Sequence, residues 1–159
     1  MIDEYYFAAS WDDLVKGITV SVLMLIISLI IVFSTILDDL PLMIGIITLY
    51  GSILIIPYLW APQGYTVKGH AVIVKRLVGD LKFQVEREPE RWNWTWWGLR
   101  LFGSGGLYGY YGFFTFRNLG RVRMYATNRH NLVLFKDEKD RKILLSPTNP
   151  EEFIQQLRK

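Results

Sequence analysis

Two long, uncharged apolar runs near the start of the chain restrict what it can fold into. The first, residues 17–37, reads GITVSVLMLIISLIIVFSTIL, and the second, residues 40–60, reads LPLMIGIITLYGSILIIPYLW. A helix of about 20 residues spans roughly 30 Å, the thickness of the hydrocarbon core of a bilayer. The first run also lacks the polar face, at helical period, that a helix in a globular core would show. We therefore predict two membrane-spanning helices.

A very short connection joins the two predicted helices. Asp38 and Asp39 separate the apolar runs, and either can cap the second helix, with Pro41 in its first turn. Helices joined so closely are antiparallel, so both ends of this hairpin emerge on one side of the membrane. The connection contains no Lys or Arg, whereas the chain after the hairpin is rich in both. The positive-inside rule then places both termini in the cytoplasm.

The segment ahead of the first run, residues 5–14, reads YYFAASWDDL. We expect it to form a short amphipathic stretch in the membrane interface, with Ser10 and Asp13 acting as the cap of the first helix. The acidic start, MIDEYY, lacks the basic region that opens a secretory signal peptide, so we expect the first run to stay in the mature protein. Residues 1–62 thus comprise an interfacial segment and the hairpin, and residues 63–159 form a separate domain.

Charge is divided unevenly between these two parts. Residues 1–60 contain one basic and six acidic residues, a net charge of −5, and residues 61–159 contain 17 basic and nine acidic residues, a net charge of +8. So basic a domain is attracted to anionic lipid headgroups or to nucleic acid. Its short tether to the bilayer disfavours nucleic acid. The absence of cysteine excludes disulfides, thiolate metal sites and cysteine nucleophiles.

Beyond residue 62 the apolar residues alternate with polar ones, which is typical of strands. We expect a meander of antiparallel strands that ends in a short amphipathic helix. Asn149, Pro150 and Glu152 mark the start of this helix, and Phe153, Ile154 and Leu157 form its apolar stripe. The expected strands are a pair within residues 66–76 that turns near Lys68 and Gly69, followed by residues 81–86, 121–126, 132–135 and 142–145.

Strands followed by one closing helix are the plan of pleckstrin-homology (PH)-like domains. Four stretches, RLFGSGGLYGYYG at 100–112, VRMYATN at 122–128, ILLSP at 143–147 and PEEF at 150–153, resemble the bacterial PH-domain family of small membrane-anchored proteins. The resemblance covers about residues 61–159, and the preceding hairpin matches what members of the family tend to show. It implies a membrane α-helical hairpin plus a PH-like antiparallel β-sandwich or barrel closed by a C-terminal α-helix, placed at the cytoplasmic (inner) membrane of a bacterium. PH-like folds mostly serve as binding platforms for lipids, peptides or sister subunits.

A tryptophan-rich segment is the most unusual part of the predicted domain. Indole rings bury well at the lipid headgroup boundary, and neighbouring arginines can meet phosphate. A packing cluster and a protein-binding hot spot remain alternative interpretations. Basic residues close to the hairpin are further candidates for membrane contact. The candidate contact residues are Arg91, Trp92, Trp94, Trp96, Trp97, Arg100, Lys75 and Arg76.

No constellation in the sequence argues for catalysis. The run Gly103–Gly106 lacks the Gly-Lys-Ser/Thr of a phosphate-binding loop, and His70 and His130 have no partner at ligand spacing. We predict no catalytic, cofactor-binding or metal-binding residue, no cofactor and no enzyme activity. The predicted function is a membrane-anchored binding or scaffold module that contacts lipid headgroups, a peptide or neighbouring membrane proteins. The alternative is an accessory subunit of a larger membrane enzyme or transporter. Expected partners are the bilayer, anionic headgroups, and other membrane-protein subunits or a second copy of the chain.

Overall fold

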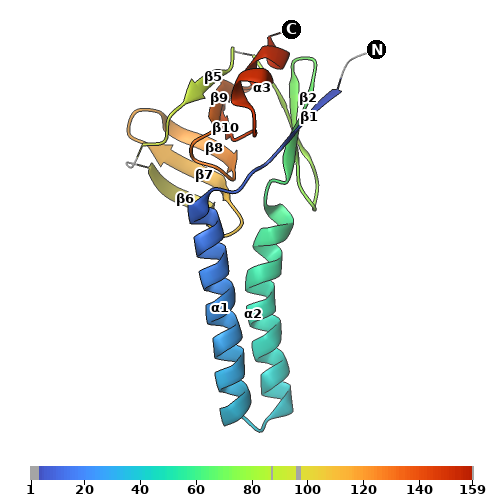
Figure 1. Cartoon of the computed structure of the whole chain (residues 1–159), viewed down its shortest axis with the longest axis vertical. Coiled ribbons are helices and arrows are strands. Elements are labelled where there is room, and N and C mark those ends of the chain that lie inside the picture. Colours follow the sequence, from blue (N-terminus) through green and yellow to red (C-terminus); the bar gives the residue numbers. More distant parts are fainter. Residues whose placement is uncertain (1–3, 87, 96–97, 159) are drawn as a thin grey trace.

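A helical hairpin projects from one end of a β-rich domain (Figure 1). The structure is a computed structural model that describes residues 4–86, 88–95 and 98–158. The helices are α1 (Asp13–Ile36), α2 (Leu40–Trp60) and α3 (Pro150–Leu157). The strands are β1 (Glu4–Ala8), β2 (Gly64–Lys68), β3 (Ala71–Lys75), β4 (Leu81–Gln84), β5 (Glu90–Trp92), β6 (Gly98–Gly105), β7 (Tyr110–Phe116), β8 (Gly120–Ala126), β9 (Leu132–Lys136) and β10 (Lys142–Leu145).

Helices α1 and α2 have 24 and 21 residues, and both are long and apolar enough to cross a membrane. None of the side chains of α2 is buried within the chain, so much of the surface of this helix is open to lipid or to a partner. Asp39 caps α2 by accepting a hydrogen bond from the Leu42 N–H at 3.3 Å. The cap of α1 is Asp12, which accepts from the Val15 N–H at 2.8 Å. The cap predicted from Ser10 and Asp13 is therefore wrong.

The first described residues form a strand rather than the interfacial stretch that we expected. Strand β1 pairs antiparallel with β2, which satisfies its backbone groups on that side. Alternation along the strand turns Phe7 into the core, where it is 7% exposed, and leaves Tyr6 61% exposed. Five residues are too few to distinguish a strand from an amphipathic helix by period, and the contacts that decide between them lie some sixty residues away in the sequence.

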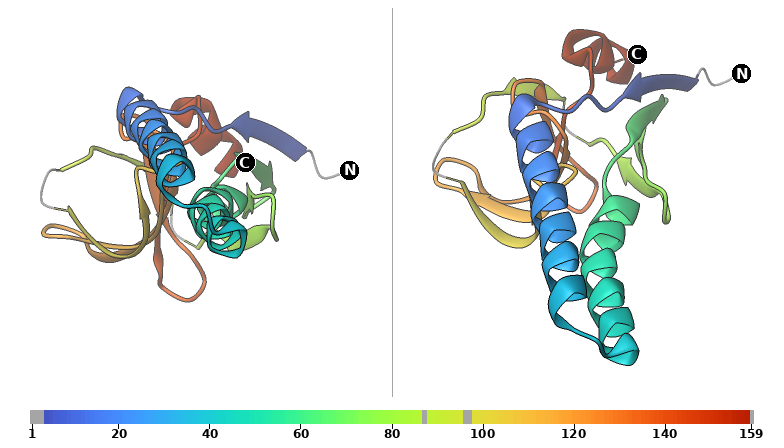
Figure 2. Two further views of the ribbon diagram at one scale, coloured as in Figure 1. Left: turned by 90° about the horizontal axis from the view of Figure 1, so that it is seen from below. Right: turned by 60° about the horizontal axis from the view of Figure 1, so that its bottom comes forward.

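The strands form two sheets, which extend to opposite sides of the hairpin (Figure 2). The first is antiparallel with the order β1-β2-β3-β4, and the second has the order β5-β9-β10-β8-β7-β6. Strand β10 lies between β9 and β8, antiparallel to β9 and parallel to β8. The expected meander is wrong at this point, because the β9–β10 hairpin folds back into the position beside β8. The predicted PH-like class, with its closing helix, is confirmed.

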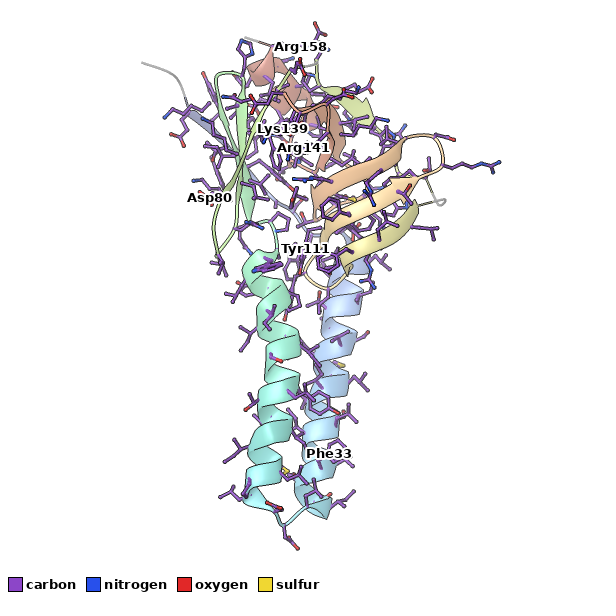
Figure 3. All side chains as sticks on the ribbon, turned by 180° about the vertical axis from the view of Figure 1, so that it is seen from behind. Phe33, Asp80, Tyr111, Lys139, Arg141 and Arg158 are labelled. Atoms are coloured by element: carbon purple, nitrogen blue, oxygen red, sulfur yellow. The ribbon has the colours of Figure 1, made fainter. Side chains whose placement is uncertain are left out.

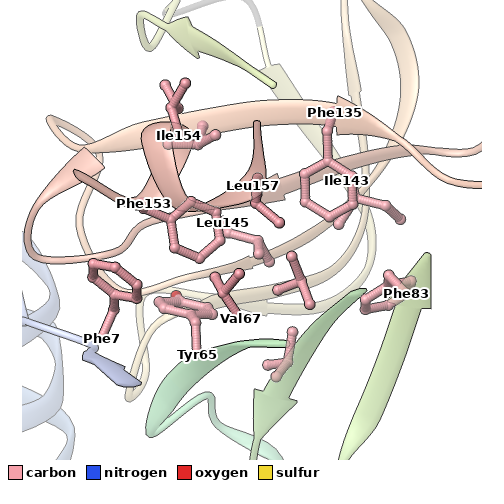
Figure 4. Packing of buried hydrophobic residues seen from close by; sticks show 13 residues of the cluster. Phe7, Tyr65, Val67, Phe83, Phe135, Ile143, Leu145, Phe153, Ile154 and Leu157 are labelled. Carbon is pink, nitrogen blue, oxygen red and sulfur yellow. The ribbon is translucent and has the colours of Figure 1, made fainter. Parts of the chain in front are cut away.

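The main core lies between the two sheets, and α3 closes it (Figure 4). Phe153 and Leu157, from the predicted apolar stripe, are 0% and 3% exposed. The Phe153 ring meets the Phe7 ring edge-on, with 5.2 Å between centroids. Asn149 is the N-cap residue of α3 but makes no side-chain cap bond; its amide donates to Glu152 at 3.3 Å instead.

A second core covers the opposite face of the six-stranded sheet. It is built mainly from aromatic and aliphatic side chains of β7, β8 and β9, and Val15 of α1 is completely buried in it. Trp11, Trp92 and Trp94 pack against the edge of this cluster. The six-stranded sheet is therefore covered on both faces over much of its area, and the first turn of α1 is part of the domain.

The start of α1 is bonded to the loop that connects β8 with β9. The carboxylate of Asp12 accepts from the Arg129 N–H at 3.1 Å and from Arg129 Nε at 2.9 Å. The Asp12 N–H donates to the Thr127 carbonyl at 3.0 Å, and the Thr127 hydroxyl donates to the Ser10 carbonyl at 2.9 Å. Asp12 is 5% exposed, so this ion pair is shielded from water.

The end of α2 is bonded to the domain at two further points. The last carbonyls of a helix lack intrahelical partners. Here the Tyr111 hydroxyl donates to the Pro57 carbonyl at 2.6 Å, and the Val78 N–H donates to the Leu59 carbonyl at 3.2 Å. Figure 3 shows Tyr111 at the top of α2. Both ends of the hairpin are thus hydrogen-bonded to the domain. These bonds fix the orientation of the domain relative to the helices.

Replacing Asp12 should weaken the folded protein strongly. In Asp12→Ala the Arg129 guanidinium loses its buried partner and α1 loses its cap, so we expect a loss of about 3 kcal/mol or more in the free energy of unfolding. Denaturant unfolding of the full chain in detergent measures this loss. The adjacent Asp13→Ala variant is the control, because the Asp13 side chain is fully exposed. An equal effect of the two substitutions would contradict the role given to Asp12.

The contribution of Asp12 should also depend on pH. Burial alone would raise the pKa of the Asp12 carboxyl, but hydrogen bonds from the Val15 N–H and from Arg129 outweigh burial and hold the pKa below its ordinary value. A carboxyl with a lowered folded-state pKa stabilises the fold above its unfolded-state pKa of about 3.9, and this stabilisation is lost as pH falls through the folded-state pKa. The melting temperatures of wild type and Asp12→Asn should therefore converge on acidification from neutral pH to about pH 3. A constant difference across that range would rule out this linkage.

Candidate membrane-facing site

Strand β6 presents apolar side chains to the outside at the end of the domain nearest the hairpin. Strands β8, β7 and β6 are stacked in that order toward the hairpin (Figures 1 and 3), and β6 is the edge strand of its sheet. Leu99, Leu101 and Phe102 are 71%, 50% and 67% exposed. The register slips between Arg100 and Phe102, which makes Leu101 an extra residue in the strand. An exposed, apolar edge strand usually needs a cover.

A second group of exposed apolar side chains lies beside the end of α2. Leu77 and Val78 occupy the turn between β3 and β4, and the Val78 backbone is bonded to α2 itself. Trp60, the last residue of α2, is 49% exposed. We call the combined surface the membrane-proximal belt. Its members are Trp60, Leu77, Val78, Leu99, Leu101 and Phe102.

A groove of about 540 Å³ runs between the last turns of α2 and β6. Ile56 and Pro57 line it from the helix, and Leu101 and Phe102 line it from the strand. Among the described residues, Arg100 is the one charged residue in its lining. The size and the mainly apolar lining are typical of small-molecule and lipid sites.

Three of the predicted contact residues flank the membrane-proximal belt. Lys75 forms an ion pair with Asp80 at 2.7 Å; the hydrogen bond to this carboxylate raises the pKa of Lys75, and Asp80 balances its charge. Arg76 Nε donates to the Gly79 carbonyl at 2.8 Å, and an Arg100 guanidinium nitrogen donates to the Gly103 carbonyl at 3.2 Å. Neither arginine forms an ion pair within the described part of the chain, so both can meet phosphate.

Trp92 and Trp94, of the tryptophan-rich segment, pack against the second core. The Trp92 ring meets Phe116 edge-on at 4.7 Å, and the Trp94 ring lies 5.5 Å from Phe116, both distances between centroids. The Arg129 guanidinium lies over the Trp94 ring at 5.9 Å. These contacts favour the packing-cluster interpretation for Trp92 and Trp94. Trp96 and Trp97 lie outside the described residues.

Arg91 also lies away from the membrane-proximal belt. Its guanidinium pairs with Glu151 at the start of α3 and donates to the His130 carbonyl at 3.2 Å. Figure 1 shows β5 beside α3, at the end of the domain opposite the hairpin. The predicted set therefore divides: Lys75, Arg76 and Arg100 lie near the hairpin, whereas Arg91 does not. Direct contact of any of them with lipid stays a prediction.

The glycine-rich loop between β6 and β7 has a packing role. A side chain at Gly106 would come within 2.4 Å of Ile18 Cδ1 in α1, and its φ of 141° also favours glycine. Beyond it, Tyr108 contacts the rings of Trp11 and Tyr58, next to the two helices. Its N–H donates to the Thr19 hydroxyl at 3.1 Å. The loop thus fits against the top of the hairpin.

Sequence reasoning missed the apolar residues of β6 and of the β3–β4 turn. The available signal was apolar side chains next to cations: Leu99, Leu101 and Phe102 surround an arginine, and Leu77 and Val78 follow two basic residues.

Within residues 4–86, 88–95 and 98–158, no group of three or more His, Asp or Glu side chains is arranged to hold a metal ion.

Comparison with known families identifies the domain. Residues 66–159, more than half of the chain, match the family model described as "Bacterial PH domain". The chain belongs to the bacterial PH domain family. No curated protein and no solved structure matches it. PH domains are generally non-catalytic binding modules, and membership in this family is consistent with a binding or scaffold role. The family match begins inside β2, so β1 and the hairpin precede the matched region.

Truncation of Trp94 should distinguish packing from lipid contact. If this side chain packs on Tyr110 and Phe116, Trp94→Ala should lower the free energy of unfolding by about 2 kcal/mol or more. Phe102→Ala is the control. Because Phe102 is 67% exposed, this substitution should leave the free energy of unfolding unchanged. Thermal unfolding in detergent compares the two variants. An unchanged melting temperature for Trp94→Ala would instead favour the interfacial interpretation.

Proposed function

We propose that this protein is a non-enzymatic binding module of the bacterial cytoplasmic membrane. In this proposal the hairpin crosses the bilayer, both termini are cytoplasmic, and the PH domain rests on the anionic headgroup layer through the membrane-proximal belt. One observation carries the proposal: exposed apolar side chains from β6 and from the β3–β4 turn gather at the end of the domain from which the two apolar helices leave. A surface that faces water rarely exposes so many apolar side chains together.

The dimensions of a bilayer fit this placement. The 24 residues of α1 rise about 36 Å, which exceeds the roughly 30 Å hydrocarbon core, so the first turns of α1 extend into the headgroup region. Strand β6 lies at that level. Its unpaired backbone groups would be costly in hydrocarbon, but water and headgroups can satisfy them in the interface. The belt side chains then reach toward the acyl chains.

Charge supports the same orientation. Arg76 and Arg100 lie beside the belt, and neither guanidinium forms an ion pair among the described residues. A basic residue close to an anionic membrane surface contributes about 1 kcal/mol of attraction. Because both ends of the hairpin are bonded to the domain, the hairpin holds these arginines close to the membrane surface. The domain is held in one orientation.

The alternative function, an accessory subunit of a larger membrane enzyme or transporter, draws support from α2. Its side chains are unburied within the chain, and a Cβ added at Gly45 or Gly51 meets nothing within 4 Å. Small residues on an open helix surface allow a partner helix to approach closely. In this case protein rather than lipid would cover the belt.

Depth measurements on the full chain test the membrane placement. The natural sequence contains no cysteine, so single-cysteine variants can carry a nitroxide label at one position each. We expect labels at Leu101→Cys and Phe102→Cys, in nanodiscs of phosphatidylcholine with phosphatidylglycerol, to be shielded from a water-soluble nickel chelate and accessible to oxygen. A label at Glu151→Cys, on α3 at the opposite end, is the control and should be fully accessible to the chelate.

Equal chelate access at positions 101 and 151 would overturn the proposal. Neutralising the cations in Arg76→Gln/Arg100→Gln should reduce the extra shielding that phosphatidylglycerol provides over pure phosphatidylcholine. Labels shielded from both oxygen and the chelate, in particles larger than one chain by light scattering, would indicate a protein cover and favour the subunit alternative.

A further inference from the structure

A basic pocket lies on the six-stranded sheet, apart from the groove at β6. It has a volume of about 250 Å³ and opens where β7, β8 and the β9–β10 turn meet. Figure 3 shows Arg141, one of its lining residues, farther from the hairpin than Tyr111. Its lining contains one acidic residue, Asp140, and one aromatic residue, Phe113. The cations that line it are Arg121, Arg123, Arg141 and Lys142.

Neighbouring groups hold three of these cations in place. The Arg123 guanidinium lies over the Phe113 ring, 5.2 Å from its centroid. Arg141 Nε donates to the carboxylate of Asp137 at 2.6 Å, and Asp137 is only 1% exposed. Lys142 Nζ donates to the Leu119 carbonyl at 2.5 Å. Side chains that are already oriented lose less freedom when they bind a ligand.

The pocket carries more positive charge than its surroundings balance. Asp137 pairs with Arg141, and Asp140 pairs with Lys136. Within the described residues, Arg121, Arg123 and Lys142 form no ion pair. Three cations are therefore available to one anionic ligand.

The positive charges of guanidinium groups from separate elements act on the nearby Tyr125. Burial raises the pKa of Tyr125, and the positive charges of Arg123, Arg76 and Arg141 act in the opposite direction. These arginines come from β8, from the end of β3 and from the β9–β10 turn. Of these, Arg123 and Arg141 also line the pocket, so guanidinium groups from two elements meet at one site.

We propose that this pocket binds a phosphate group. The planar guanidinium fork matches phosphate oxygens in a bidentate manner, and Lys142 adds a point charge. The phosphate can come from a lipid headgroup, since β8 is two strand spacings, about 10 Å, from β6, or from a soluble phosphorylated molecule. The lipid source rests on the membrane placement proposed above, and the soluble source does not.

Pyrophosphate is the probe for the pocket itself. Full-length protein in phosphatidylcholine nanodiscs should bind it in calorimetric titrations at constant ionic strength. Arg121→Gln/Arg123→Gln should weaken this binding at least tenfold, whereas Lys68→Gln, an exposed cation on β2, should change it less than twofold. Arg121→Lys/Arg123→Lys keeps the positive charges but removes the guanidinium forks, so its affinity for pyrophosphate should be intermediate. The melting temperature of each variant shows separately whether it is folded.

Nanodiscs that contain phosphatidic acid, a lipid phosphomonoester, distinguish the two sources. If the lipid supplies the phosphate, pyrophosphate should bind the wild type at least tenfold more weakly in these discs than in phosphatidylcholine discs. An unchanged affinity for pyrophosphate would assign the pocket to a soluble ligand. The inference is overturned if wild type binds no pyrophosphate in phosphatidylcholine discs, or if Lys68→Gln weakens binding as much as the arginine variants. The depth labels at positions 101 and 102 report on the membrane placement independently.

Discussion

The buried carboxylate of Asp12 connects the membrane hairpin to the domain. It caps the N-terminus of α1 and at the same time pairs with Arg129 in the loop between β8 and β9. At the other end of the hairpin, Tyr111 and Val78 donate to the free carbonyls of α2. Each bond satisfies a backbone or charged group that would otherwise be costly to bury. The domain therefore sits on the helices in one orientation, and the position of each surface relative to the hairpin follows from it.

How much could be predicted from sequence depended on whether the deciding contacts were local. The hairpin and α3 were predictable, because uncharged length and apolar period are properties of a single segment. Strand β1 and the insertion of β10 beside β8 were not, because each depends on pairing with a strand elsewhere in the chain. Trp92 and Trp94 raised a different difficulty. Indole suits both a headgroup boundary and an aromatic core, so composition alone could not decide between them.

The site followed the same pattern. Lys75, Arg76 and Arg100 were recognisable as cations near the hairpin, but the apolar residues that make this surface distinctive were not singled out. Leu99, Leu101 and Phe102 look like ordinary core residues of a strand until β6 is known to be an edge. The pocket that joins Arg123 with Arg141 and Lys142 could likewise not be predicted, since these residues lie on separate elements. Membership in the bacterial PH domain family is consistent with a binding role, and the two surfaces are the places where we propose that binding occurs.

Strand β1 has a consequence for the order of events during synthesis. It leaves the ribosome before either apolar helix, yet its partner β2 follows the whole hairpin. The four-stranded sheet can close only after both helices have been made, and only if the chain before them stays on the side where the rest of the domain emerges. Until then β1 lacks its partner strand and Phe7 lacks its place in the core. Pairing of β1 with β2 thus requires that the segments before α1 and after α2 lie on the same side of the hairpin.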